Sequence, residues 1–233
     1  MAKAPRVGEV KTRLVPPLSP AEAAALGGAF IQDIAANILA ASERVAIEGY
    51  VAYSPPGSQA EFAALLPDAI QLLPPREIGL GLSLRYAVED LFSVGFGAVC
   101  LVNADSPNLP TDFLVEAARA LQRPGDRVML GPAEDGGYYL IGLKRPHRRV
   151  FEDIAWSTES VFEQTLDRAA ELGLETGALP RWYDVDDIDS LQRLTNEVLG
   201  TGLGEAYSAH HTARVLRELV AGSGRAWLTR SGH

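Results

Sequence analysis

The sequence has 233 residues, of which 47% are hydrophobic and 22% are charged, as in an ordinary globular protein. Its 21 basic and 30 acidic side chains give a formal charge of −9. This excess of acid argues against a nucleic-acid binder and a polybasic membrane-surface protein, because both need clustered Lys and Arg.

Strand-like and helix-like runs alternate along the chain, which predicts an α/β fold with a mostly parallel sheet. Ser19 and Glu22 form a capping-box pattern, and an apolar stripe at intervals of four follows them. The predicted strands are residues 49–53, 70–73, 98–102, 127–130, 138–143 and 174–179. The predicted helices are those starting after Ser19 and after the cap Thr111, and residues 59–66, 83–94, 159–172, 189–198 and 205–220.

No change in composition marks a domain boundary, so we expect one domain over residues 1–199 and a C-terminal helical extension with a tail over 200–233. Cys100, the only cysteine, lies in an apolar run that predicts a buried, unreactive thiol. We find no secretion signal at the N-terminus and expect no apolar stretch long enough to span a bilayer. A cytoplasmic protein is therefore expected.

The first candidate site is the basic N-terminal segment. The first 13 residues carry one acid, Glu9, and four cations, a local charge of +3. A glycine-containing loop rich in Lys and Arg can present N–H groups and cations to phosphates. From the charge alone, a disordered basic N-terminus is an equally good interpretation. The four cations are Lys3, Arg6, Lys11 and Arg13.

The second candidate is Asp105, which follows the predicted strand 98–102 in the segment Asn103-Ala-Asp-Ser-Pro107. In open α/β sheets, ligands bind beyond the carboxyl ends of the strands. An aspartate at that place is a natural ligand for Mg²⁺ or Mn²⁺ bridging to a diphosphate. The alternative is a plain Asx-turn leading into the next loop.

The third candidate is the turn Gly131-Pro-Ala-Glu-Asp-Gly-Gly-Tyr-Tyr139 between two predicted strands. Taken alone it favours an ordinary hairpin. In a functional interpretation, the two glycines let a substrate approach the backbone, while Asp135 or Glu134 serves as a base or hydrogen-bond acceptor.

The fourth candidate is Trp182-Tyr-Asp-Val-Asp-Asp187. On an extended segment Asp184 and Asp186 point the same way, and with Asp105 they would suit one or two hard cations. Acids gathered at the N-terminus of the next helix are the alternative. A dinucleotide-binding fingerprint is not supported, because Leu84 stands where the third glycine of Gly79-Leu-Gly81 would be.

Together these segments resemble the DUF2064-type family of bacterial glycosyltransferase-like proteins, in the GT-A or nucleotide-diphospho-sugar transferase superfamily. The match runs over about residues 2–191, and that family is similar to nucleotidyltransferases of cofactor biosynthesis. The segments are Lys3-Ala-Pro-Arg-Val-Gly-Glu-Val-Lys-Thr-Arg-Leu14, Asn103-Ala-Asp-Ser-Pro-Asn-Leu-Pro110, Gly131-Pro-Ala-Glu-Asp-Gly-Gly-Tyr-Tyr-Leu-Ile-Gly142, Trp156-Ser-Thr158 and Trp182-Tyr-Asp-Val-Asp186.

The resemblance implies a three-layer α/β/α sandwich that binds a nucleotide beside its first strand. It implies nucleotide or phosphate contacts from Lys3, Pro5, Gly8, Lys11, Arg13 and Arg85. It implies that Asp105, with Asp184 or Asp186, holds Mg²⁺ or Mn²⁺. Asp135 would be catalytic, and the acceptor would lie beside Gly136, Gly137, Tyr138, Trp156, Ser157 and Thr158.

The chain departs from the family pattern at two places. Relatives have an apolar strand before the Lys-Ala-Pro segment, whereas here Met1 stands where that strand would end. We expect this truncation to expose the edges of the neighbouring strands. The second departure is the stretch from Glu77 to Arg85, which lacks the aspartate of its relatives and puts recognition of the base or sugar there in doubt.

These observations predict a metal-dependent transferase with a nucleotide-activated donor and a small-molecule acceptor. Glycosyl transfer from a nucleotide-diphospho-sugar is slightly favoured. The first alternative is a nucleotidyltransferase that joins a nucleoside triphosphate to a phosphorylated small molecule. The second is a nucleotide-binding module without catalysis. No nucleic-acid partner is expected, and the sequence leaves the oligomeric state open.

Overall fold

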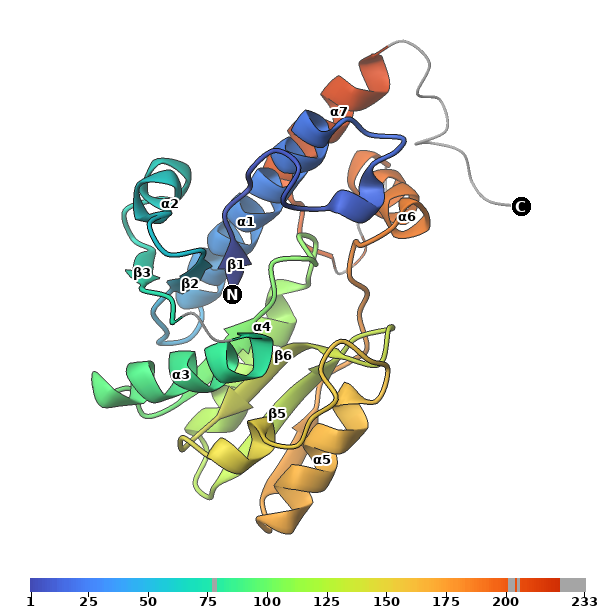
Figure 1. Cartoon of the computed structure of the whole chain (residues 1–233). Helices are drawn as coiled ribbons and strands as arrows, with labels where there is room; N and C mark the ends of the chain where they lie inside the picture. The colour runs from blue at the N-terminus through green and yellow to red at the C-terminus, as the bar shows by residue number, and fades with distance from the viewer. Residues whose placement is uncertain (77–78, 201–203, 205, 223–233) are drawn as a thin grey trace.

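A computed structural model describes residues 1–76, 79–200, 204 and 206–222. The strands lie in two sheets (Figure 1). The first sheet is parallel throughout, in the order β1 (Ala2–Lys3), β2 (Tyr50–Ser54) and β3 (Gln71–Leu73). The second has the order β4 (Val99–Val102), β6 (Tyr138–Leu143), β5 (Arg127–Pro132) and β7 (Glu175–Ala178). In it β6 runs antiparallel to β4 and β5, whereas β7 is parallel to β5.

Helices cover both faces of the second sheet and produce the predicted α/β/α layers. On one face its side chains pack with α1 and α4; on the other they pack with α3, α5 and the short η2 turn. α6 and α7 pack with the N-terminal half of α1. The helices are α1 (Pro20–Ser42), α2 (Gln59–Leu65), α3 (Gly79–Ser93), α4 (Thr111–Gln122), α5 (Val161–Glu171), α6 (Ile188–Leu199) and α7 (His210–Ala221), with the 3-10 turns η1 (Thr12–Leu14) and η2 (Arg148–Phe151).

Local signals set some helix starts but not others. The capping box of α1 is present: the Glu22 amide donates to Ser19 Oγ at 3.3 Å and the Ser19 amide donates to Glu22 Oε2 at 2.8 Å. Thr111, predicted as a cap, does not cap α4, because its hydroxyl donates to the buried Asn37 Oδ1 at 2.6 Å. α3 begins four residues before the predicted Ser83, and α7 begins five residues after the predicted start at 205.

α1 is a long apolar helix of 23 residues. Within the described part of the chain, it is the one helix whose length and composition would allow it to cross a membrane, so the expectation that no stretch reaches this length was wrong. However, 67% of its apolar window is buried inside the protein. The core helix of a globular domain meets the same criteria, and α1 contacts both α4 and α7.

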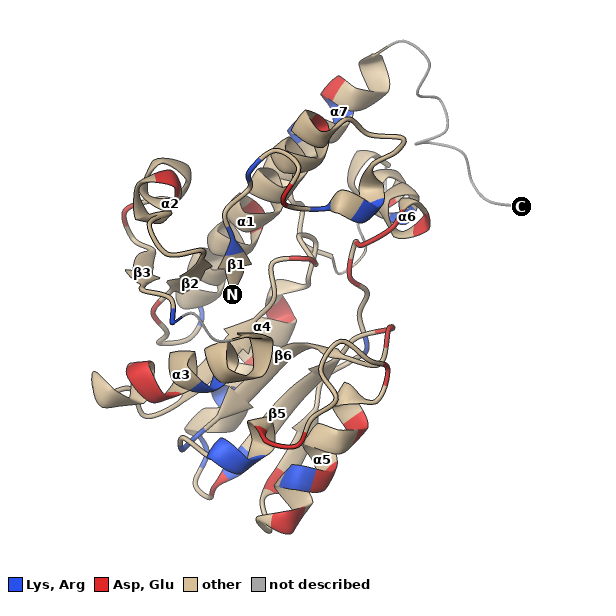
Figure 2. Ribbon diagram, in the orientation of Figure 1, with Lys and Arg blue, Asp and Glu red and all other residues tan. Residues whose placement is uncertain are grey.

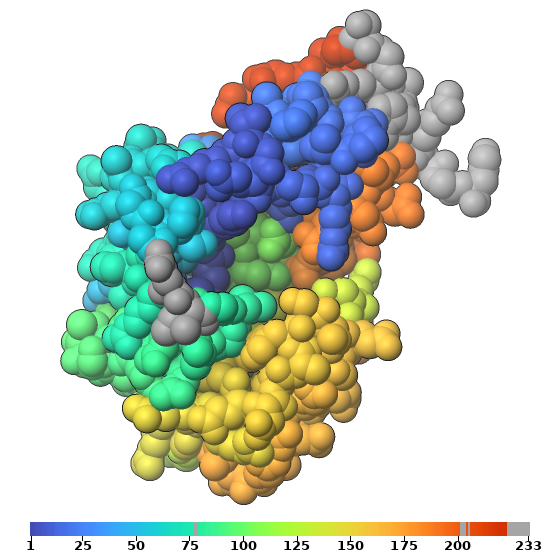
Figure 3. Space-filling model, in the orientation of Figure 1, coloured from blue at the N-terminus to red at the C-terminus, as the bar shows by residue number. Residues whose placement is uncertain are grey.

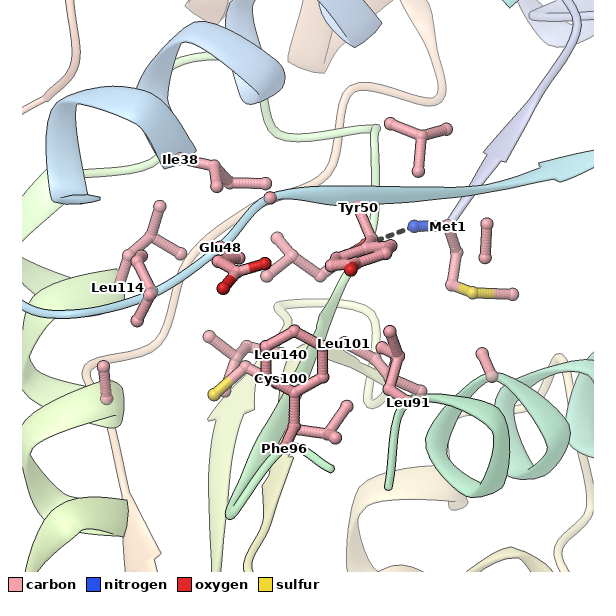
Figure 4. A pocket seen from close by; sticks show the side chains of 18 of the residues that line it. Met1, Ile38, Glu48, Tyr50, Leu91, Phe96, Cys100, Leu101, Leu114 and Leu140 are labelled. Atoms are coloured by element: carbon pink, nitrogen blue, oxygen red, sulfur yellow. Dashed lines mark hydrogen bonds between the residues drawn. The ribbon is translucent and has the colours of Figure 1, made fainter. Parts of the chain in front are cut away.

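An apolar cavity of about 780 Å³ separates the two sheets. Because β1 has only two residues, the edge of β2 before Tyr53 and the edge of β4 have no strand partner among the described residues. Figure 4 shows Tyr50, Leu91 and Leu114 directed into this space. The Met1 ammonium lies at its end and donates to Val102 O at 2.9 Å; burial lowers the pKa of this group to about 6.

Cys100 faces the same cavity (Figure 4). The residue is exposed to this space, which differs from the burial expected from the sequence, although protein atoms surround the thiol. Burial raises the pKa of Cys100 to about 12. Because the thiolate is the reactive form, this thiol is a poor nucleophile near neutral pH, in agreement with its predicted inertness.

Candidate functional site

A polar cleft of about 1010 Å³ opens at the carboxyl ends of β1, β2 and β4. Figure 3 shows the hollow between the N-terminal segment in blue, α3 in blue-green and residues near 156 in yellow. Strand ends create such a place because each strand must leave the sheet there, so successive loops with polar side chains meet at one edge. Its loop lining comes from residues 54–56, 103–105, 135–138, 156–159 and 184–186.

Three aspartates form one wall of the cleft. Asp105 lies on the loop after β4, and Asp184 and Asp186 lie on the extended segment before α6. Two hydrogen bonds hold this segment against the loop: the Val185 amide donates to Asp105 O at 2.9 Å, and Ser106 Oγ donates to Tyr183 O at 2.9 Å. The predicted convergence of the three carboxylates on one cavity is therefore present.

Asp184 is the most desolvated of these carboxylates. Its Oδ1 accepts hydrogen bonds from Asn103 Nδ2 and Ser106 Oγ, both at 2.7 Å. Burial raises its pKa to about 6, and the negative charges of Asp105 and Asp135 add to the effect, whereas the two donors oppose it. The sequence analysis did not predict the roles of Asn103 and Ser106, although both belong to the segment singled out around Asp105.

Lys11 lies behind this wall and does not line the cleft. Its ammonium donates to Asp105 Oδ1, to Val185 O at 2.8 Å and to Asp186 Oδ1 at 3.2 Å. Burial alone would lower the pKa of Lys11, but the two carboxylates raise it above its usual value, so the group stays charged. Figure 2 shows this basic N-terminal segment beside the acidic segment that leads into α6.

The arrangement differs from the metal site expected from the sequence. Asp105 and Asp186 share the Lys11 ammonium, and one oxygen of Asp184 is committed to Asn103 and Ser106. Across the residues that the structure describes, no group of three or more His, Cys, Asp or Glu side chains is arranged to hold a metal ion. The three aspartates thus do not form one ligand set, and the requirement for Mg²⁺ or Mn²⁺ stays a prediction.

The opposite wall is the turn between β5 and β6. Asp135 lines the cleft, and its Oδ1 accepts a hydrogen bond from the Gly137 amide at 2.9 Å. Gly136 has φ of +88°, and a Cβ there would lie 2.1 Å from Glu159 O. Only glycine permits this contact, through which the turn docks on the segment carrying Trp156, Ser157 and Thr158. Gly136 therefore shapes the wall without lining it, whereas Gly137, Tyr138, Trp156, Ser157 and Thr158 line it.

Trp156 also explains a glycine that the sequence analysis assigned to no site. A Cβ on Gly81 would lie 2.2 Å from Trp156 Nε1, so the missing side chain lets the indole pack against the first turn of α3. The Gly79-Leu-Gly81 pattern thus serves helix-to-loop packing at the rim of the cleft.

The predicted phosphate contacts fall into two groups. Lys3 and Arg13 line the cleft, and Arg13 is largely exposed, with Nη1 3.9 Å from Asp186 Oδ2. Pro5, Gly8 and Arg85 do not line it. Arg85 instead pairs with Glu89 at 2.9 Å and Glu152 at 3.8 Å, because it lies on a face of α3 turned away from the cleft.

Several lining residues were not predicted. Most of them lie after a strand end or on α3, and Glu159 lies just before α5. The position of β2 before a Pro-rich turn was the signal that could have identified the first of them. They are Ser54, Pro55, Pro56, Pro74, Pro75, Arg76, Ser83, Tyr86, Asp90 and Glu159.

The comparisons with known proteins agree with the fold. The crystal structure of a protein from Desulfovibrio desulfuricans G20, provisionally named a nucleotide-diphospho-sugar transferase, is similar with a TM-score of 0.79 and 28% sequence identity. The similarity covers 94% of this chain and 93% of that chain. No curated protein matches the sequence. The model of the DUF2064 family, uncharacterized proteins conserved in bacteria, matches residues 37–158, and the chain therefore belongs to this family.

Proposed function

We propose that the protein transfers a glycosyl group from a nucleotide-diphospho-sugar to a small-molecule acceptor. One observation carries the proposal: the polar cleft at the strand ends is lined by the cations Lys3 and Arg13 together with the carboxylates of Asp105, Asp135, Asp184 and Asp186. The likeness to the Desulfovibrio protein over nearly the whole of both chains supports the donor class.

In this proposal Lys3 and Arg13 bind the donor diphosphate. Both are cations at the mouth of the cleft, and charge develops on the diphosphate as the bond to the sugar breaks. Donor groups fixed in the site before the reaction stabilise that charge without further reorganisation. No step is assigned to a metal, because the carboxylates expected to hold one already face Lys11.

The acceptor would bind on the side of Asp135. The hydroxyl oxygen of the acceptor forms a bond to the sugar carbon, and the bond from that carbon to the diphosphate breaks. Asp135 takes the proton of the acceptor hydroxyl. Among the described residues Asp135 makes its side-chain hydrogen bond through Oδ1 alone, to the Gly137 amide, which leaves Oδ2 for the acceptor. Trp156 and Tyr138 supply apolar surface beside it.

The test is a thermal-shift screen of nucleotide sugars and nucleoside triphosphates, followed by product analysis. A ligand that binds the native state raises the melting temperature. We expect stabilisation by at least one nucleotide sugar and release of a nucleoside diphosphate on adding acceptors. Release of pyrophosphate from a triphosphate would establish the nucleotidyltransferase alternative instead, and binding without turnover would establish the non-catalytic one.

A further inference from the structure

We propose that the Lys11 ammonium is the resident counterion of Asp105 and Asp186, in the position where such a carboxylate pair would otherwise bind a divalent metal. The proposal rests on the proposed function, because this wall belongs to the cleft in which the donor would bind. Its consequence is that these two carboxylates do not bind a divalent ion while Lys11 is in place.

The hydrogen-bond donors of the Lys11 ammonium are saturated. An ammonium has three N–H donors and no acceptor. Lys11 uses all three, on Asp105 Oδ1, Val185 O and Asp186 Oδ1. A carbonyl and two carboxylates are also the oxygen types that hard divalent cations prefer. The ammonium therefore satisfies the same oxygen atoms that would otherwise attract a metal.

Protein atoms enclose the Lys11 ammonium. The Lys11 side chain is 8% exposed, and the ring of Phe30 lies 5.2 Å from Nζ. An ammonium near an aromatic face gains a cation–π attraction. A buried ammonium held by two carboxylates on one side and a ring on another cannot move into water without breaking these contacts. Lys11 is thus part of the fold of the wall and is not a mobile arm in the cleft.

The backbone at Lys11 is strained. It has φ of 48° and ψ of 37°, the left-handed conformation that residues other than glycine seldom adopt. Strained backbone persists where surrounding contacts over-determine it. Here the conformation directs the side chain from the N-terminal loop toward two other segments, the loop after β4 and the segment before α6. Lys11 joins all three segments through one charged group.

The balance of charge between Asp105 and Asp186 depends on Lys11. Without the ammonium, Asp105 and Asp186 would face each other's charge at the site with no buried cation between them. Carboxylates in that position take up protons or bind a cation. With the ammonium present, an entering divalent ion would meet a buried like charge, which opposes its binding. Removal of Lys11 should therefore create the metal affinity that Lys11 suppresses.

The experiment measures Mn²⁺ binding directly, without donor or acceptor, from the electron paramagnetic resonance signal of free Mn²⁺. We expect wild-type protein to bind no stoichiometric Mn²⁺ at this site. The neutral variant Lys11→Met should gain affinity by at least about tenfold. The double variant Lys11→Met/Asp105→Asn should lose that gain, since it lacks one of the two carboxylates. A change in folding alone would not depend on Asp105 in this way.

Two further variants serve as controls. Lys3→Met removes a cation that lines the cleft but does not touch Asp105 or Asp186, so Mn²⁺ affinity should stay at the wild-type level. Lys11→Arg keeps the charge and should also stay at that level. Stoichiometric Mn²⁺ binding by wild-type protein that Asp105→Asn abolishes would overturn the proposal, and so would a folded Lys11→Met protein without gained affinity. If Lys11→Met does not fold, the wild-type and Asp105→Asn titrations still decide.

This test stands apart from the screen for nucleotide sugars. A protein that binds no nucleotide sugar but gains Mn²⁺ affinity on losing Lys11 would refute the proposed function and leave this inference intact. The reverse result would refute only this inference.

Discussion

Two hollows of similar size lie side by side in this protein and have opposite chemistry. The cleft, of about 1010 Å³, is lined by charged and polar loops at the ends of strands. The cavity, of about 780 Å³, lies between the edges of β2 and β4 and is lined mainly by aliphatic and aromatic side chains. The residues that line both hollows are Met1, Ala2, Ala52, Leu73, Ala87 and Leu101–Asn103, so the two environments meet along one boundary.

The difference follows from the part of a strand that each hollow meets. Loops that leave a strand end carry polar side chains, and their charges find partners, as Lys11 does with Asp105. Strand edges inside a sheet that helices cover on both faces carry apolar side chains and backbone groups that need another strand. The cleft thus presents charged and polar groups, whereas the cavity presents apolar side chains and strand edges that have no partner among the described residues.

The largest predicted effect lies in the cleft. Asp135→Asn keeps an oxygen that can accept from the Gly137 amide, so the turn should persist, but it removes the proton acceptor. We expect the transfer rate to fall by about 10²–10⁴-fold, the usual contribution of a general base. Nucleotide binding and the melting temperature should stay near the wild-type values. Initial rates at saturating donor and acceptor measure the effect.

The neighbouring acid provides the matched control. Glu134 does not line the cleft and pairs with Arg193 at 3.0 Å, so Glu134→Gln should leave the rate unchanged. Equal rates for Asp135→Asn and wild type would remove Asp135 from the chemistry and weaken the contrast between the two hollows.

The second prediction addresses the cavity. An N-terminal extension of five aliphatic residues before Met1 should enter it as a strand, since β1 already pairs with β2 and the Met1 amino group donates to Val102 O in the last residue of β4. Each buried aliphatic side chain contributes about 1.5–3 kcal/mol, offset in part by about 1–2 kcal/mol per ordered residue. The extension also removes a buried amino group. We expect a net gain of roughly 2–3 kcal/mol in the free energy of unfolding.

The control extension has the same length but contains Gly, Ser and Asp, which cannot fill an apolar space. Thermal unfolding compares the two proteins, and the binding of an apolar fluorescent dye reports whether the cavity is filled. Equal melting temperatures with equal dye binding would show that the cavity does not accept a strand.

How much could be predicted from the sequence depends on whether the partners of a residue lie near it in the chain. The capping box at Ser19 and the alternation of Asp184 and Asp186 depend on neighbours within a few residues, so both are present as predicted. The strand-end position of Asp105 follows from general α/β topology and was likewise predictable.

Other features depend on partners distant in the sequence. Lys11 and Arg13 look alike as cations in a basic loop, yet one is buried against Asp105 and the other is largely exposed. Thr111 looks like a helix cap, but the buried Asn37, 74 residues away, accepts from its hydroxyl. Arg85 looks like a phosphate ligand, but ion pairs with Glu89 and Glu152 hold it on the far face of α3. Side-chain partners of this kind come from tertiary packing, which no local pattern specifies.

The smallest predicted effect concerns Asp184, which lines the cleft but is largely removed from water. Its pKa is raised in the folded protein to about 6, so between about pH 4 and 6 the folded state binds a proton that the unfolded state has lost. Stability from this group is therefore greatest at low pH and falls as the pH rises through that window.

Asp184→Asn, which can still accept from Asn103 and Ser106, should unfold like wild type at pH 4. At pH 7 it should be more stable by about 1–2 kcal/mol, less than the full shift implies because the side chain is part-exposed in the cleft. Urea unfolding at the two pH values measures this difference, and a variant less stable than wild type at pH 7 would show that the charge of Asp184 is already compensated.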